Sequence, residues 1–282
     1  MSKTPKLHNW EYKLPIIPTQ IAPLSSSKVQ SFLDSIYNPA ARTCKLAPIP
    51  SPPPIETTDA SVAFFDSAGD DPIYYGQNNL IVRWRQQPER FDLTAKNRGT
   101  NINYNPLLES TSYPDCNNLA HKEEYGVTSG SVVANIAFDN EFKSNGSCDF
   151  NDWELDQLTG NDSQFWNGIF PILPSPSPAV PIGLVNDITV AESQLNLGEI
   201  PFGGLHKHES IEGTLIAWVN ADTGTPIAAE FSYSVKHSQL KSGSTPPPAF
   251  EAFLEALTTE AGNANWLNDH MKTYYVYHPP ES

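Results

Sequence analysis

The sequence predicts a β-dominated α+β fold: an antiparallel β-sandwich or barrel with two peripheral helices. The first observation is compositional. Only 17% of the 282 residues are charged and 39% are hydrophobic, so the surface must consist largely of Asn, Ser, Thr, Gln and Pro, as in many β-sheet and long-loop proteins. The second is that most apolar segments are short, carry β-branched or aromatic residues, and are bounded by Gly, Asn, Asp or Pro. The third is that only two segments show strong helical spacing.

Seven segments have the character of strands. They are residues 60–66, 79–85, 130–138, 183–191, 213–220, 226–236 and 272–278. The clearest hairpin joins residues 214–220 to 227–235 through a turn that contains Gly224, and its second strand alternates between apolar and mixed residues. Folding about this turn pairs residue 220 with residue 226 and fixes the register of the whole ladder.

Two segments are predicted to be helices that pack on the core. In residues 27–37 the apolar side chains recur at helical spacing, Ser27 can cap the start, and Asn38-Pro39 is expected to end the helix. Residues 249–261 follow the same pattern after three prolines, and Gly262 follows at the end. The apolar residues of the two helices are Val29, Phe32, Leu33, Ile36, Phe250, Phe253, Leu254 and Leu257.

Prolines divide the chain. They concentrate in residues 48–54, 171–181 and 246–248, where polyproline-like connectors are expected. We therefore predict an N-terminal arm over residues 1–55, with a short helix and a Pro-rich connector, and a β-rich main domain over residues 56–282. The proline-rich stretch at 171–181 marks a candidate seam inside that main domain.

The chain is strongly acidic. Lys and Arg number 17 against 32 Asp and Glu, which gives a net charge of −15 and a pI near 4.7. Such a field repels phosphate backbones and anionic lipid, so neither nucleic acid nor a membrane surface is expected as a partner. The short run Arg83-Trp84-Arg85 is interpreted as a strand with two outward arginines around an inward tryptophan.

The three cysteines, Cys44, Cys116 and Cys148, are odd in number and widely spaced, so they form neither a disulfide framework nor a zinc site by spacing. Free thiols favour synthesis in a reducing cytoplasm. The first residues lack the apolar segment of a signal peptide, and no apolar run reaches the ~20 residues that span a bilayer.

The densest chemistry lies in residues 204–213. In an extended strand His206 and His208 would face the same way with Glu212 in phase, which would offer a metal two nitrogens and an oxygen. His237 is a further candidate ligand. The predicted hairpin register places His237 opposite Glu209 and on the other face from His208, so that only a one-residue bulge would bring it to the metal.

The spacing His206-x-His208-x-x-x-Glu212 resembles the first metal motif of the cupin family, in which two histidines and a glutamate hold a divalent metal in a small barrel. The resemblance implies Fe, Mn or Zn as cofactor and a small-molecule substrate. The sequence departs from the family at residues 217–219, where cupins have glycine, and has no second motif around His237. Gly204-x-His206-x-His208 also resembles the motif by which phage tail fibres and spikes bind one metal between three chains.

Three functions follow as hypotheses. The first is a structural or assembly protein, such as an accessory virion or tail component in a particle, because catalytic motifs are weak, the surface is acidic but low in charge, and proline-rich arms could be buried on neighbouring subunits. The second is a cupin-like metalloenzyme that uses His206, His208 and Glu212. The third is a carbohydrate-binding β-sandwich with exposed faces of aromatic residues such as Trp10, Trp166 and Trp266. The first hypothesis expects other protein subunits as partners and no enzymatic activity.

Overall fold

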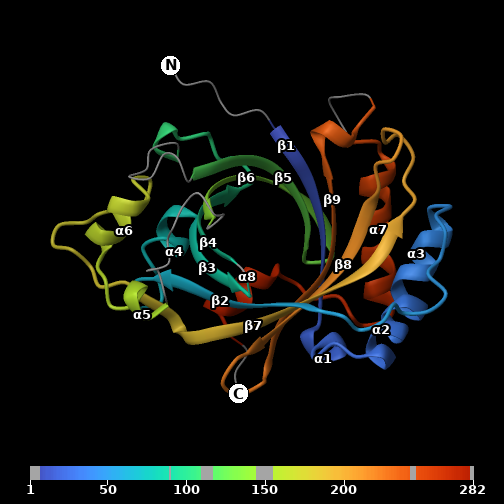
Figure 1. Cartoon of the computed structure of the whole chain (residues 1–282), viewed down its shortest axis with the longest axis horizontal. Coiled ribbons are helices and arrows are strands. Elements are labelled where there is room, and N and C mark those ends of the chain that lie inside the picture. Colours follow the sequence, from blue (N-terminus) through green and yellow to red (C-terminus); the bar gives the residue numbers. More distant parts are fainter. Residues whose placement is uncertain (1–6, 89, 109–116, 144–154, 242–245, 280–282) are drawn as a thin grey trace. The chain divides into compact units, whose positions relative to one another are not determined.

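A computed structural model of the chain describes residues 7–88, 90–108, 117–143, 155–241 and 246–279. Within them nine strands form a closed barrel in the order β1-β5-β6-β4-β3-β2-β7-β8-β9 (Figure 1). The pairs β1–β9, β2–β3, β3–β4, β4–β6 and β8–β9 are antiparallel. The β-dominated α+β class is therefore confirmed, in its barrel form.

The barrel strands are β1 (Leu7–Ile16), β2 (Thr58–Asp66), β3 (Leu80–Gln87), β4 (Arg90–Gly99), β5 (Asn117–Thr128), β6 (Ser131–Lys143), β7 (Gly183–Ile200), β8 (Ile211–Asn220) and β9 (Pro226–Lys236). The helices are α1 (Pro18–Ile21), α2 (Ser26–Phe32), α3 (Asn38–Thr43), α4 (Tyr75–Asn78), α5 (Leu155–Leu158), α6 (Ser163–Ile169), α7 (Ala249–Asn263) and α8 (Lys272–Tyr277). A π-helical turn, Leu33–Tyr37, joins α2 to α3, and short 3-10 turns lie at Pro106–Leu108 and His237–Gln239.

The chain divides into two compact units that are discontinuous in sequence. Unit 1 comprises residues 1–7, 60–122 and 135–190, and unit 2 comprises residues 8–59, 123–134 and 191–282. The predicted boundary at residue 55 stays a prediction, although β1 inside the expected arm is hydrogen-bonded to β9.

The core of unit 1 lies between one face of its sheet and the helices α5 and α6. Val82 and Trp84 of β3 and Leu93 of β4 point to this side, where Trp166 of α6 is fully buried. Alternation along a strand places the neighbours of these residues on the opposite face. The predicted inward Trp84 is thus confirmed, and its flanking arginines share the other face.

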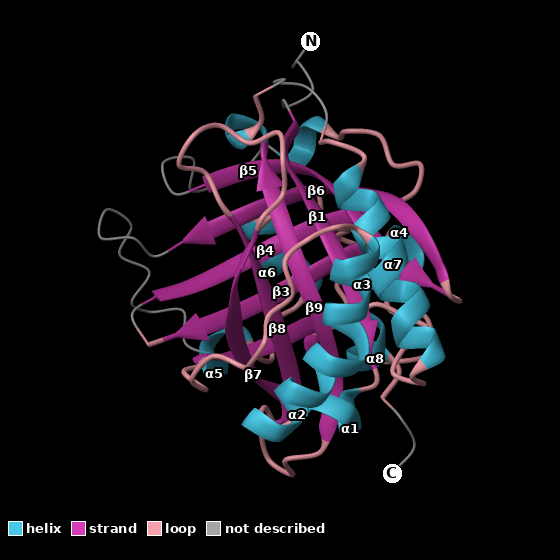
Figure 2. Ribbon diagram, turned by 90° about the vertical axis from the view of Figure 1, so that its right-hand side faces the viewer, coloured by secondary structure: helices cyan, strands magenta, loops and turns pink. Residues whose placement is uncertain are grey.

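The core of unit 2 lies where α7 packs on β1, β8 and β9, and Figures 1 and 2 show α1, α2 and α3 on the same side of these strands. Tyr12 stacks on Tyr233 with ring centroids 4.9 Å apart, and Phe253 of α7 lies 5.6 Å from Tyr233. Aromatic pairs at such distances add to the free energy of area burial.

Both predicted core helices are present. The first continues further than expected, because the π-helical turn leads into α3 and Pro39 falls in the first turn of α3, where no amide donor is needed. The expected stop at Asn38-Pro39 is therefore wrong.

The predicted strand 272–278 is wrong, because Lys272–Tyr277 is helix α8. Its buried residues Thr273, Val276 and Tyr277 recur at the i, i+3, i+4 spacing of a helix. The segment was predicted as a strand because its tyrosines and valine have high β-propensity, and its helical spacing was overlooked.

The predicted hairpin register is confirmed from Thr214↔Ser232 to Trp218↔Ala228, and a bulge follows between Trp218 and Val219.

Cys44 is a free thiol, while Cys116 and Cys148 lie outside the described residues. Within the described part of the chain, no helix is long and apolar enough to cross a membrane.

Asp66 holds the loop that follows β2. Its carboxylate accepts hydrogen bonds from the backbone amides of Ser67, Tyr74 and Tyr75 at 2.8–2.9 Å. Burial raises the pKa of Asp66 to about 6, although the three amides act in the opposite direction. The carboxylate therefore organises the loop that leads into β3.

Gly213 of β8 is a position where the packing excludes a side chain. A Cβ atom there would lie 2.8 Å from the Phe231 ring and 3.4 Å from Ile200. We expect Gly213→Ala to lower the free energy of unfolding by about 1–3 kcal/mol through overpacking, measured by chemical denaturation. The control is Gly183→Ala, where no atom lies within 4 Å. Equal stability of the two variants would contradict this packing.

Candidate functional site

The structure places His206 and His208 outside any strand. β8 begins only at Ile211, the backbone amide of His206 bonds to the carbonyl of Gln239 at 2.9 Å, and His208 lies in a turn with φ of 74°. Both side chains are exposed. The expected extended strand with His206, His208 and Glu212 in phase is therefore wrong.

The other candidate ligands are engaged elsewhere. Glu212 accepts a hydrogen bond from Asn196 at 2.8 Å, and His237 stacks on Trp10 with ring centroids 6.3 Å apart. Among the described residues, no three His, Cys, Asp or Glu side chains are grouped so that they could hold a metal. Metal binding by His206, His208 and Glu212 stays a prediction, which metal analysis of a His206→Ala, His208→Ala variant would test.

The aromatic residues proposed for sugar stacking are part of the core. Trp10, Trp166 and Trp266 are all buried, and the fold is a barrel instead of a sandwich. Stacking on a sugar needs an open ring face. The hypothesis of a carbohydrate-binding β-sandwich is therefore wrong.

A charged cluster of unit 1 lies on the sheet face opposite its hydrophobic core. Register and ion pairs bring together residues from β3, β4, β5 and β6. We call this set the charged sheet face: Arg83, Arg85, Asp92, Thr94, Lys96, Arg98, Lys122, Asp139 and Glu141. It holds five cations against three anions, in a chain whose net charge is −15.

Direct cross-strand neighbours build this face. Arg83 lies opposite Thr94 and Arg85 opposite Asp92, and on the next ladder Thr94 lies opposite Glu141. Side chains of directly opposed residues lie on the same side of a sheet, about 4.5–5.5 Å apart at Cβ. Thr94 therefore has an arginine on one side and a carboxylate on the other.

Ion pairs order part of the charged sheet face. Asp139 contacts Lys122 at 3.0 Å and Lys96 at 3.5 Å, and Asp92 contacts Arg85 at 3.8 Å. The Asp92 side chain is only 3% exposed. Buried charges in such a network are fixed in position, because each would be strongly destabilising without its partners.

Several residues of this face have buried polar atoms that make no hydrogen bond within the described chain, and Arg83 and Thr94 are two of them. The Nε atom of Arg83 and the hydroxyl of Thr94 are buried and have no hydrogen-bond partner, and Thr94 is 4% exposed. A buried polar group without a partner lowers stability by about 1–3 kcal/mol. Such groups are typical of a site that is completed by a ligand.

Unit 2 has a cluster of opposite character, which we call the acidic cluster. It consists of Glu11, Lys13, Glu124, Glu192, Trp218, Glu230 and Lys272. Lys13 bonds Glu11 at 2.7 Å and Glu124 at 2.8 Å, and Lys272 of α8 bonds Glu230 at 2.9 Å while lying over the Trp218 ring. The carboxylates of this cluster are thus mostly neutralised by lysines of the same chain.

Sequence reasoning missed both clusters, although one signal was present. The alternation in Arg83-Trp84-Arg85 fixes which residues share a face, but we expected the arginines to be outward and solvated. In a closed barrel the face away from the helical core is also enclosed, and the Arg85 side chain is 11% exposed. Lys13 and Glu11 were missed because residues 1–55 were interpreted as an arm.

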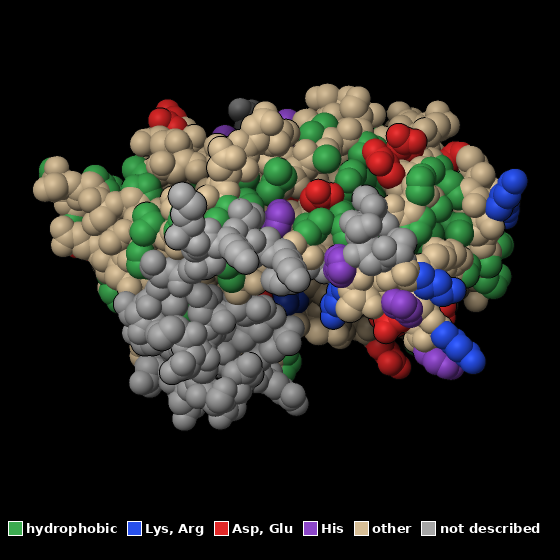
Figure 3. All heavy atoms as spheres, turned by 90° about the horizontal axis from the view of Figure 1, so that it is seen from above, with side chains coloured by type: hydrophobic (Ala, Val, Ile, Leu, Met, Phe, Trp, Pro, Cys, Tyr) green, Lys and Arg blue, Asp and Glu red, His purple; other side chains and the backbone are tan. Residues whose placement is uncertain are grey.

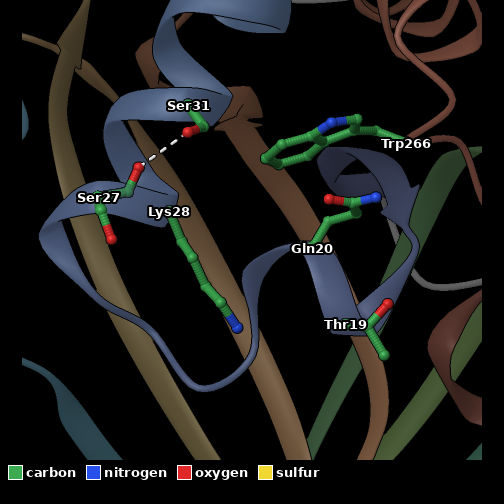
Figure 4. A pocket seen from close by; sticks show the side chains of 6 residues that line it. All are labelled: Thr19, Gln20, Ser27, Lys28, Ser31 and Trp266. Carbon is green, nitrogen blue, oxygen red and sulfur yellow. Dashed lines mark hydrogen bonds between the residues drawn. The ribbon is translucent and has the colours of Figure 1, made fainter.

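On the face of the molecule that Figure 3 shows, acidic, basic and histidine side chains gather toward the right-hand side, among uncharged side chains and backbone. A small open cavity of about 250 Å³ lies in unit 2, lined by Thr19, Gln20, Ser27, Lys28, Ser31 and Trp266 (Figure 4). Ser31 donates to the carbonyl of Ser27 at 3.0 Å, and Lys28 donates to the carbonyl of Ala22. Two of the donors that line the cavity are therefore used within the chain.

No family model and no curated protein matches the sequence. Among solved structures, the "putative adenylyl cyclase" from Hippeastrum, described as having a dominant triphosphatase activity, has a TM-score of 0.43 and 11% identity, over 98% of this chain and 97% of that one. A "putative adenylate cyclase" from Bacillus halodurans has a TM-score of 0.42 and 10% identity, over 94% of each chain.

The hypothesis of a structural or assembly protein of a virion or tail is wrong. The solved structures that are similar to the chain carry the names of enzymes, whereas the sequence favoured a protein without enzymatic activity. The cupin-like metalloenzyme is not supported either, because His206 and His208 lie outside any strand and no three candidate ligands are grouped among the described residues. What this chain binds must be argued from its own residues.

Proposed function

We propose that the chain is an enzyme that binds a small molecule carrying phosphoryl groups on the charged sheet face of unit 1. The observation that supports this most is the arrangement of Arg83 and Thr94. They lie opposite each other on neighbouring strands, and each keeps a buried polar atom without a partner. A phosphoryl oxygen would accept from both.

The chemistry of the surrounding residues fits an anion with several oxygens. Guanidinium groups bind phosphate through paired hydrogen bonds, and ammonium groups add point charge. Arg83, Arg85, Lys96, Arg98 and Lys122 supply both kinds of group from three strands, β3, β4 and β5. Because strands are rigid supports, these groups are oriented before the ligand arrives, which strengthens electrostatic stabilisation of a reacting phosphoryl group.

The carboxylates of the charged sheet face could bind a divalent cation or accept a proton during catalysis. Asp92, Asp139 and Glu141 lie on the same face as the cations. Mg²⁺ is usually held by one or two carboxylates together with phosphate oxygens, so it needs no cage of three protein ligands. Such an ion would neutralise charge on the phosphoryl oxygens, and a remaining carboxylate could take a proton from attacking water.

Release of inorganic phosphate tests this function. The purified chain would be incubated with Mg²⁺ and, separately, pyrophosphate, tripolyphosphate, a nucleoside triphosphate and a phosphate monoester. We expect turnover of at least one of these compounds, and we expect Asp139→Asn to reduce it while the affinity for the substrate changes less. Absence of both turnover and binding across this set would contradict the proposal.

Thr94→Val separates binding from folding. Valine has nearly the same shape without the hydroxyl, so the variant removes a buried group that has no partner. We expect the free energy of unfolding to rise by about 1 kcal/mol and the affinity for a phosphorylated ligand to fall about ten-fold. Chemical denaturation and calorimetric titration measure the two effects. If Thr94→Val destabilised the protein and left affinity unchanged, the hydroxyl would be structural.

A further inference from the structure

The Pro-rich segment between α3 and β2, residues 46–56, is an exposed extended strap in unit 2. The half-buried positions are Leu46, Ile49, Pro52, Pro53 and Ile55, and all of them except Pro53 are spaced by three residues. Exposed side chains lie between them: Ala47, Pro48, Pro50, Ser51, Pro54 and Glu56. A spacing of three is that of the polyproline II helix, which has three residues per turn. At the end of the strap the amide of Glu56 bonds the carbonyl of Pro54 at 2.9 Å.

A buried amide side chain fixes this strap to the unit. Asn38 is 5% exposed, and its side chain donates to the carbonyl of Ile49 at 2.8 Å and accepts from the amide of Ile49 at 2.7 Å. The amide of Leu46 also bonds the carbonyl of Ala41 at 2.8 Å. The strap is therefore held in one conformation, with one edge against the protein and the other edges toward solvent.

Such a segment is suited to recognition. Proline-rich polyproline II segments bind grooves lined by aromatic side chains, and a conformation fixed in advance reduces the entropy lost on binding. The stretch Pro50-Ser51-Pro52-Pro53 has the P-x-x-P spacing that such grooves accept. A simple connector would need neither an anchor as specific as Asn38 nor an exposed row of prolines.

The charges beside the strap indicate the character of the partner. Arg42 and Lys45, just before it, are both exposed, and no ion pair engages either within the described chain. These two residues give the N-terminal end of the strap a local positive charge, on a protein whose net charge is −15. An acidic rim beside the aromatic groove of a partner would complement this end and orient the strap.

We propose that residues 46–56 are a docking segment for a partner domain that has an aromatic-lined, proline-reading groove with an acidic rim. This proposal is independent of the charged sheet face, because the strap contains none of its residues. The partner would bring the enzyme to a complex without touching its substrate.

Binding of the full chain to purified proline-reading domains tests the proposal. A panel of SH3, WW and EVH1 domains would be titrated with the labelled full-length chain, followed by fluorescence anisotropy. We expect saturable binding by at least one domain. A variant with Pro48→Ala, Pro50→Ala and Pro54→Ala should bind about ten-fold more weakly or worse, whereas Pro201→Ala, at an exposed proline outside the strap, should bind as the parent does.

A second variant distinguishes weaker binding from loss of folding. Arg42→Glu with Lys45→Glu leaves every proline in place and should also weaken binding by several-fold, with an unchanged melting temperature. The proposal would be overturned if no domain of the panel bound the chain, or if the triple variant bound a domain as tightly as the parent does. A concentration-dependent dimer that the triple variant abolishes would also overturn it, because a second copy of this chain would then occupy the strap.

Discussion

Arg83→Met is expected to weaken the binding of a phosphorylated ligand by about 10- to 100-fold, the effect of losing a charged hydrogen bond of about 1.5–3 kcal/mol. Arg83 is an arginine of the charged sheet face whose buried Nε atom has no hydrogen-bond acceptor, and whose guanidinium has no ion pair, among the described residues. Its guanidinium is therefore available to a ligand. Methionine keeps the apolar stem, so the fold should be retained.

The control for this prediction is Arg42→Met, which removes one positive charge from an exposed position on α3. It should leave affinity within two-fold, because an exposed charge that does not contact the ligand is screened by salt. Calorimetric titration of both variants with tripolyphosphate makes the comparison. If the two variants bound the ligand equally well, Arg83 would have no part in the site.

Lys272→Met is expected to lower the free energy of unfolding by about 3–5 kcal/mol, because it breaks a buried ion pair by removing one partner. Lys272 of α8 lies 2.9 Å from Glu230 and 4.0 Å from Glu192, and the side chains of these glutamates are 2% and 4% exposed. Without the ammonium group Glu230 would carry a buried charge with no cation in contact. We therefore infer that Lys272 fixes α8 to the acidic cluster of unit 2.

Two further variants test whether charge causes this loss. Glu230→Gln in the Lys272→Met background should restore at least half of the lost stability, because the buried charge is removed as well. Lys207→Met, at an exposed lysine of the same unit, should change stability by less than about 0.5 kcal/mol. Chemical denaturation measures all three. A loss in Lys272→Met that Glu230→Gln does not relieve would indicate that packing of α8, and not charge, is decisive.

Much of the fold could be predicted from local patterns. The hairpin β8–β9 was predicted with its register, because Gly224 and the alternation of β9 specify the turn and the faces. The helix α7 was predicted because Phe250, Phe253, Leu254 and Leu257 form one apolar stripe. These elements bury a single face, so their period is visible in the sequence.

The strands β1, β4 and β5 were not predicted, for a physical reason. Each carries charged residues on one face, such as Glu11 and Lys13 of β1 or Asp92 and Lys96 of β4. In an open sheet this face would be solvated, but a closed barrel encloses it. Closure is a property of the whole chain, so the clustering of charges on the charged sheet face was not visible from spacing along the sequence.

The same limit explains the metal prediction. His206 and His208 are close in sequence, and closeness was interpreted as convergence on one face of a strand. The structure instead has a turn with His208 at positive φ, and β8 begins three residues later. The residues that do converge, such as Arg83, Thr94 and Glu141, are separated by up to 58 positions and come together only through strand pairing.

Calorimetric titration of the unmodified chain with tripolyphosphate at low and at physiological salt tests the central claim most directly. If the charged sheet face binds phosphoryl groups, the titration will show saturable binding to one site, weaker at the higher salt concentration because several cations contact the ligand. A chain that gives no saturable binding at either salt concentration would contradict the claim.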